Sequence, residues 1–117
     1  MITQETGRCA EEKALAYLQD KGLKLVERNY SCRLGEIDLI MRDSEYLVFI
    51  EVRSRTNVHY GGGLASITYA KRQKIIKTTA HYLIKNRLHD KFPLRFDVVS
   101  FDVGSISWLK DAFGVGY

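Results

Sequence analysis

Two acidic residues in the middle of the chain have the type and the spacing that metal chemistry requires. Asp38 and Glu51 each lie in a run of alternating apolar residues, and a polar tetrapeptide at residues 42–45 between the runs predicts a hairpin turn. An antiparallel pairing closed by a loop of about four residues places the acids directly opposite each other, with Cβ atoms roughly 5 Å apart. A two-residue loop makes them diagonal neighbours. Side by side, they predict either a cation site or a structural ion pair with Arg53 or Arg55.

The two-residue period of a strand indicates which side chains of the two runs share a face of the sheet. Residues two apart on a strand point to the same side, so three aliphatic residues of each run share one face, while Asp38 shares the other with Glu36 and Ile40, and Glu51 shares it with Phe49 and Arg53. A one-residue slip in the pairing would turn one aliphatic set to the wrong side, which favours the proposed register. The expected aliphatic set is Ile37, Leu39, Met41, Val48, Ile50 and Val52.

Hydrophobic periodicity and turn residues predict the other elements. The hairpin should be antiparallel, and the second helix should connect parallel strands, which gives an α/β fold with a mixed β-sheet flanked by helices in a single domain, residues 1–117. Before the hairpin we expect a helix from Gln4 or Glu5 to Lys21, ended by Gly22, and a short strand Leu23–Tyr30. After the hairpin we expect a mobile loop Ser54–Ile67 and a helix from Ser66 or Thr68 to about Leu88. The chain should end with a strand Leu94–Val103 and a short strand Ile106–Leu109, followed by a tail that folds back through Phe113.

The first helix is expected to carry an acid toward the sheet. Glu11 lies four residues before Leu15 and seven before Leu18, so helical spacing puts it on the inward stripe, whereas Glu12 should lie nearer water. An acid on an apolar stripe needs a partner. The alternative is an exposed acid stabilised by the helix dipole.

The second helix combines an apolar side with a basic one. Its core side is predicted from Ile76, Ala80 and Leu83, with Tyr69 and Ile84 at the margins. The basic stripe consists of Lys74, Lys77, His81 and Lys85, spaced by three or four residues.

Composition and charge limit the class of protein. The chain has 117 residues, 45% of them hydrophobic and 27% charged, as in an ordinary globular domain. Its net charge is +4, and residues 71–91 contain seven Lys or Arg against one acid, which predicts either a nucleic-acid partner or a solvated helix face. We find no apolar run of membrane-spanning length and no signal peptide, so a cytoplasmic protein without a membrane partner is expected. The spacing of Cys9 and Cys32 favours reduced thiols.

Three segments together resemble a known family. They are Gly7-x-x-x-Glu11, the run 35–38 (GEID) and the run 51–55 (EVRSR). The chain resembles the YraN family of small bacterial proteins, which are similar to nucleases of the PD-(D/E)xK, or restriction-endonuclease-like, superfamily. The resemblance covers nearly the whole chain and implies that superfamily's αβββαβ core, close in architecture to archaeal Holliday-junction resolvases. A homodimer is an expectation from those resolvases alone.

The resemblance also implies a site. Asp38 and Glu51 would bind Mg²⁺ or Mn²⁺, joined by Glu11 and the carbonyl oxygen of Val52, because hard divalent cations prefer oxygen ligands. The implied reaction is attack of metal-activated water on a phosphodiester, in DNA more than RNA, with branched DNA among the candidates. Gln73 and Lys74 would contact the scissile phosphate or orient the water, and further contacts to nucleic acid would come from Arg55, Lys71 and Lys77.

One position departs from the superfamily pattern. Arg53 stands where members usually have lysine. A guanidinium can hold a phosphate and stabilise its charge, but it stays protonated and is a poor proton-transfer group. The alternative to a nuclease is therefore a non-catalytic nucleic-acid-binding or scaffold protein that retains the fold. A third reading is an interaction protein whose basic helix meets an acidic protein partner.

Overall fold

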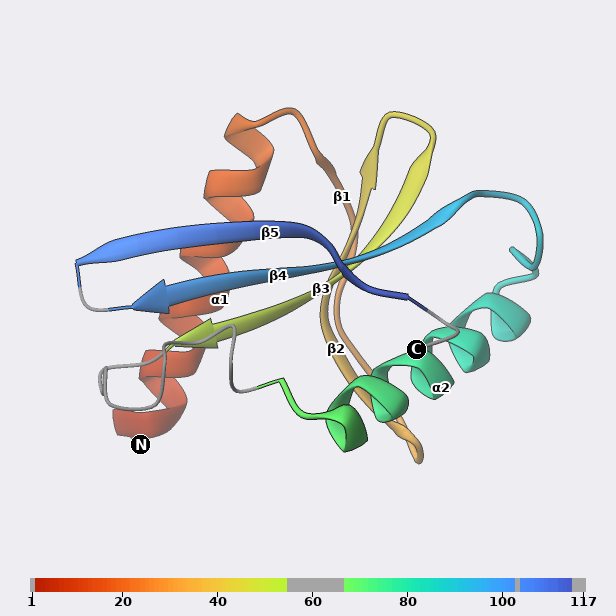
Figure 1. Ribbon diagram of the computed structural model, residues 1–117, viewed down its shortest axis with the longest axis horizontal. Helices are drawn as coiled ribbons and strands as arrows, with labels where there is room; N and C mark the ends of the chain where they lie inside the picture. Colours follow the sequence, from red (N-terminus) through yellow and green to blue (C-terminus); the bar gives the residue numbers. More distant parts are fainter. Residues whose placement is uncertain (1, 55–66, 103, 115–117) are drawn as a thin grey trace.

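The protein is a five-stranded sheet with two helices, in the expected order of elements (Figure 1). The computed structural model describes residues 2–54, 67–102 and 104–114. The expected loop Ser54–Ile67 lies almost wholly outside the described residues, as does Arg55. The elements are α1 (Ile2–Asp20), β1 (Lys24–Cys32), β2 (Gly35–Asp43), β3 (Tyr46–Ser54), α2 (Tyr69–Lys85), β4 (Leu94–Asp102) and β5 (Ser105–Phe113).

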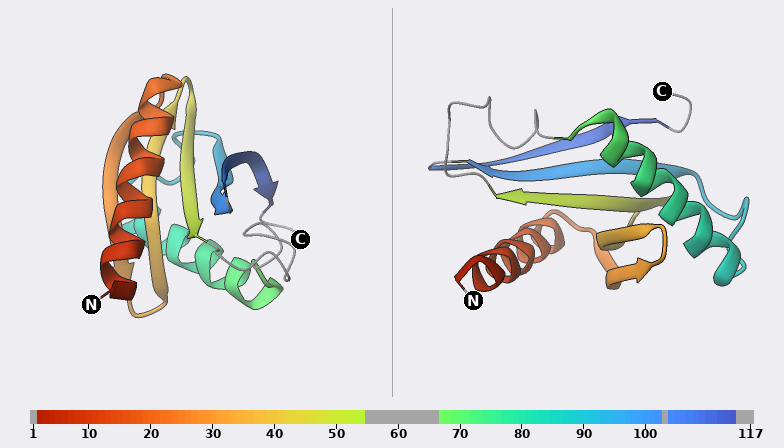
Figure 2. Two further views of the ribbon diagram at one scale, coloured as in Figure 1. Left: turned by 90° about the vertical axis from the view of Figure 1, so that its left-hand side faces the viewer. Right: turned by 90° about the horizontal axis from the view of Figure 1, so that it is seen from below.

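The sheet is mixed, as the sequence predicted. Its strands lie in the order β1-β2-β3-β4-β5; β3 and β4 are parallel and the other neighbours antiparallel. The chain passes from β3 to β4 through α2, and the helices cover opposite faces, giving three layers (Figure 2). One core cluster, called the α1 cluster, joins α1 to β2, β3 and β4. A second, called the α2 cluster, joins α2 to all five strands. Neither described helix is long and apolar enough to cross a membrane.

The central hairpin has the register that aligns the acids. The turn between β2 and β3 consists of Ser44 and Glu45, and the paired residues run to Leu39 opposite Ile50. The pairing ends there, and the same register continued by one step would bring Asp38 opposite Glu51. The expectation that a two-residue loop would make the acids diagonal neighbours is therefore wrong.

The predicted aliphatic face is wrong at one residue. Ile37 packs in the α2 cluster with its β1 partner Tyr30, whereas Leu39 packs in the α1 cluster. On β1, Arg28 pairs with Leu39 and Tyr30 pairs with Ile37, so Asn29 is the residue opposite Asp38. The backbone of Asn29 is left-handed (φ 52°). That conformation interrupts the regular alternation of side chains, so the ends of β1 and β2 turn toward α2.

The helix ends follow local sequence signals. Gly22 has φ 100° just after α1, and the Leu23 N–H donates to the Leu18 carbonyl at 3.0 Å, which closes the last turn. Thr68 caps α2, since its hydroxyl accepts a hydrogen bond from the Lys71 N–H at 3.1 Å.

The buried side of α2 differs from the prediction. Leu83 is buried as expected, but Ile76 is half-buried and Ala80 is exposed. Thr78 is fully buried, and its hydroxyl is satisfied within the helix because it donates to the Lys74 carbonyl at 2.8 Å. The complete buried set is Ile75, Thr78, Thr79, Tyr82 and Leu83.

A close approach explains why threonine suits this helix face. A Cβ on Gly35, at the start of β2, would lie only 2.9 Å from Thr78 Oγ1. Glycine therefore lets the turn between β1 and β2 pack directly on α2.

A buried ion-pair network extends β5 beyond its predicted end. Asp97 is completely buried and accepts two hydrogen bonds from Arg95, at 2.9 Å each. It also accepts from Trp108 Nε1 at 2.9 Å and from the Asp111 N–H at 3.0 Å, across the irregular part of the β4–β5 pairing. The strand consequently runs to Phe113 instead of ending at Leu109.

Candidate metal and phosphate site

The site begins where β2 and β3 stop pairing with each other. Their last register pair is Leu39 and Ile50, but β3 continues to Ser54 alongside β4. Asp38 Oδ2 accepts a hydrogen bond from the Val52 N–H at 2.8 Å. A side chain thus serves as the acceptor for a strand N–H at this end of the ladder, which fixes the carboxylate between the two strands.

Asp38 is an acid in an unfavourable environment for charge. Burial first, and then the neighbouring carboxylate of Glu51, raise its pKa from 3.8 to about 8. The Val52 hydrogen bond and the charge of Lys71 lower this pKa, and the charge of Glu11 raises it. The charges of Glu51, Glu11 and Lys71 therefore all influence the protonation of Asp38.

Glu51 is held by two cations. It is 7% exposed, and its Oε2 lies 3.1 Å from Lys71 Nζ and 3.3 Å from Arg53 Nη1. Glu51 alternates with Phe49, a residue of the α2 cluster, so it faces that helix. Lys71 reaches it from the first turn of α2.

Glu11 approaches from the other layer. It is half-buried on α1, next to buried Ala10 and one turn before Leu15, whereas Glu12 is exposed, as the helical spacing predicted. Its effect on the pKa of Asp38 indicates electrostatic proximity to that carboxylate. The two helices, on opposite faces of the sheet, thus send charged side chains of opposite sign toward the end of the β2–β3 ladder.

The donor set suits a particular kind of metal site. Within the described residues, no group of three or more His, Cys, Asp or Glu side chains is arranged to hold a metal ion. Mg²⁺, however, is commonly held by one or two carboxylates together with water and substrate phosphate. Asp38 and Glu51 fit that pattern by their chemistry, because a divalent cation would offset both the burial of the Asp38 charge and its repulsion by Glu51, which together raise the pKa of Asp38.

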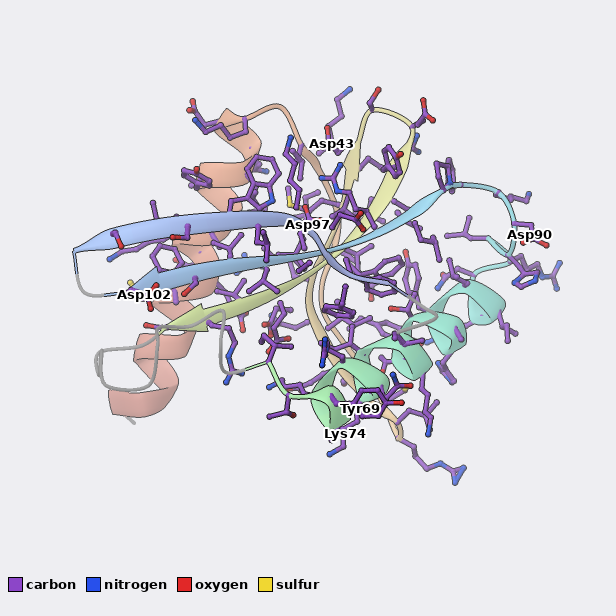
Figure 3. The ribbon with its side chains drawn as sticks, in the orientation of Figure 1. Asp43, Tyr69, Lys74, Asp90, Asp97 and Asp102 are labelled. Carbon is purple, nitrogen blue, oxygen red and sulfur yellow. The ribbon has the colours of Figure 1, made fainter. Side chains whose placement is uncertain are left out.

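The predicted nucleic-acid contacts on α2 are not all at this site. Lys71 is in it; Gln73 is half-buried in the same turn, and Lys74 and Lys77 are further along the helix, with Lys74 exposed. Figure 3 shows Lys74 near the start of α2, and its Cβ would lie 3.7 Å from a Cβ on Gly35. Lys74 therefore lies over the turn between β1 and β2.

The other half of the basic stripe contacts β1. The Tyr30 hydroxyl lies 2.6 Å from His81 Nδ1, and Lys85 Nζ lies 5.7 Å from the centre of the Tyr30 ring. Sequence reasoning missed this contact and also the pairing of Lys71 with Glu51. For Lys71 a signal existed, because capping by Thr68 puts residue 71 in the first turn of the helix.

Comparison with known proteins places the chain in a family. Residues 10–101 match the model of Uncharacterised protein family UPF0102. A UPF0102 protein of Legionella pneumophila (strain Corby) is 66% identical over 98% of this chain and 99% of its own length. Relatives from Alkalilimnicola ehrlichii and Cupriavidus metallidurans are 51% and 49% identical, over 93% and 97% of this chain and 86% and 84% of their own lengths. The chain therefore belongs to the UPF0102 family, the YraN-type family that its motifs resemble.

Proposed function

We propose that the protein is a divalent-metal-dependent nuclease that hydrolyses phosphodiester bonds of DNA, branched DNA included, on a restriction-endonuclease-like αβββαβ core. The observation that carries the proposal is the pair Asp38 and Glu51 at the open end of the β2–β3 ladder, with the pKa of Asp38 raised to about 8. A carboxylate whose pKa is strongly raised by burial and by a neighbouring charge is typical of functional sites.

Each residue of the site has a role in this proposal. Asp38 and Glu51 would hold Mg²⁺ or Mn²⁺, with Glu11 adding negative charge from α1. The bound ion would supply a Lewis acid that offsets the charge developing on the phosphate. Arg53 and Lys71 would bind the phosphate oxygens, because both cations already lie beside Glu51.

A non-catalytic nucleic-acid-binding protein is the second candidate. Arg53, at the position where the superfamily usually has lysine, favours it, since a guanidinium holds phosphate but stays charged. The basic side chains of Lys74 and Lys77 on α2 would serve this function equally well.

Cleavage assays test the proposal. Labelled duplex, single-stranded and four-way-junction DNA, with RNA of matched sequence, would be incubated with the protein in Mn²⁺ or Mg²⁺. We expect cleavage that Asp38→Asn and Glu51→Gln abolish and that Glu36→Gln retains, because Glu36 is an exposed acid on the same strand as Asp38. Equal cleavage by wild type and both site variants would indicate a contaminating nuclease and refute the proposal.

Binding without cleavage would instead support the second candidate. That outcome requires tight, salt-sensitive binding of DNA. Gain of activity in Arg53→Lys would then locate the missing group. Binding to an acidic protein that duplex DNA does not displace would favour an interaction protein. A homodimer and a cytoplasmic location stay predictions.

A further inference from the structure

Glu51 is paired with two cations that differ in their exposure and in the element that carries them. Arg53 lies two residues further along β3, so it shares the strand and the sheet face of Glu51. Lys71 comes from a different element, and its side chain is 40% exposed while that of Glu51 is 8% exposed. The ammonium is thus the partner that can leave Glu51 for solvent without disturbing the sheet.

A divalent ion and the Lys71 ammonium would compete for the carboxylate of Glu51. Mg²⁺ binds carboxylate oxygens at about 2.1 Å. Lys71 Nζ lies 3.1 Å from Glu51 Oε2, so an ion on the acid pair would lie within roughly 5 Å of it and the two charges would repel. Asp38 and Glu51 would be the residues that hold such an ion, since burial of Asp38 and the neighbouring charge of Glu51 both disfavour an uncompensated carboxylate there.

From this geometry we infer that Lys71 is an exchangeable cation: it holds Glu51 when no divalent ion is bound and moves to a nucleic-acid phosphate when one is. The inference rests on the proposed metal site but not on catalysis. The first turn of α2 contains no acidic residue, which keeps the surroundings of Lys71 favourable for phosphate. Since a phosphate that attracts Lys71 also frees Glu51, ion and nucleic acid bind with positive coupling, and the coupling is reciprocal.

Metal titrations test this inference without any measurement of cleavage. Mn²⁺ binding would be followed by calorimetry, with and without saturating duplex DNA, for wild type, Lys71→Met and Lys91→Met. Lys91 is exposed and precedes β4, so its variant removes the same charge from the chain elsewhere. We expect Lys71→Met to bind Mn²⁺ roughly tenfold more tightly than wild type in the absence of DNA.

DNA supplies the second readout. It should lower the Mn²⁺ dissociation constant of wild type and of Lys91→Met several-fold, and that of Lys71→Met much less. Lys71→Gln should behave like Lys71→Met. Agreement between the two variants would show that the effect comes from loss of the ammonium and not from misfolding of one variant. Mn²⁺ affinity unchanged or weakened in both Lys71 variants, or full coupling retained in them, would overturn the inference.

The titrations separate this inference from the proposed function. If neither wild type nor Lys71→Met binds Mn²⁺, or if adding Asp38→Asn to Lys71→Met does not weaken binding, both are refuted. If coupling is present and DNA is never cleaved, the nuclease proposal fails and the inference about Lys71 stands.

Discussion

Asp38→Asn tests the electrostatics of the site through protein stability. The amide keeps the size of the side chain and an oxygen that can accept the Val52 N–H, but it carries no charge. In the folded protein the pKa of Asp38 is raised from 3.8 to about 8 by burial and by Glu51. An acid with a raised pKa leaves stability intact below its unfolded pKa and lowers it as pH rises toward the folded value.

The size of the effect follows from the window between those two pKa values. Both pH 5 and pH 7 lie inside it, and each pH unit corresponds to about 1.4 kcal/mol. Over these two units the free energy of unfolding of wild type should therefore fall by about 3 kcal/mol relative to Asp38→Asn. For a domain with roughly 5–15 kcal/mol of stability, such a difference is large.

Urea unfolding at several pH values, with a chelator present, measures the difference. Glu36→Gln, which removes an exposed acid from the same strand, should show no such pH-dependent difference from wild type. Mn²⁺ at one hundred times its dissociation constant should stabilise wild type by about 2.7 kcal/mol at pH 7 and Asp38→Asn by much less. A stability difference between wild type and Asp38→Asn that stays constant from pH 5 to pH 7 would show that the pKa of Asp38 is not raised in the folded protein.

Three further predictions concern the elements that position the site. Gly35→Ala should lower the free energy of unfolding by about 1–3 kcal/mol in urea titrations, because its Cβ would lie 2.9 Å from Thr78 Oγ1. Arg95→Met should cost about 3–5 kcal/mol in the same assay, since it leaves completely buried Asp97 without its cation. Glu11→Gln should weaken Mn²⁺ binding in calorimetry by a few-fold, because it removes one of the negative charges near Asp38.

Each of these three predictions has a control variant that tests its physical cause. Gly22→Ala meets no atom within 4 Å, so it reports the cost of the left-handed backbone alone and should be milder than Gly35→Ala. Glu12→Gln, next to Glu11 but exposed, should leave Mn²⁺ affinity unchanged. The double variant R95M/D97N should be more stable than R95M alone if an unpaired buried charge is the cause, and equal stability would contradict it.

Local pattern was sufficient to predict the hairpin that carries Asp38 and Glu51. The two-residue period on both sides of the turn excluded an odd slip but left opposite and diagonal placements of Asp38 and Glu51 open, and the observed register, continued by one step, corresponds to the opposite placement. Helical spacing likewise separated half-buried Glu11 from exposed Glu12. The element order and the mixed sheet followed from the same periodicities.

Contacts between distant segments were beyond sequence reasoning. The ion pair of Lys71 with Glu51 depends on how α2 crosses the sheet, which periodicity does not specify. The polarity of Thr78 gives no sign of burial, but its hydroxyl is satisfied within its own helix and its small size suits the contact with Gly35. The change of face at Ile37 depends on one left-handed residue that has no distinct pattern in the sequence.

A crystal structure grown with Mn²⁺ tests the proposed acid pair most directly. We expect an anomalous peak about 2.2 Å from carboxylate oxygens of both Asp38 and Glu51, with Lys71 Nζ no longer within about 4 Å of Glu51. An empty acid pair at saturating Mn²⁺, with Lys71 and Arg53 still bound to Glu51 as at 3.1 and 3.3 Å here, would contradict it.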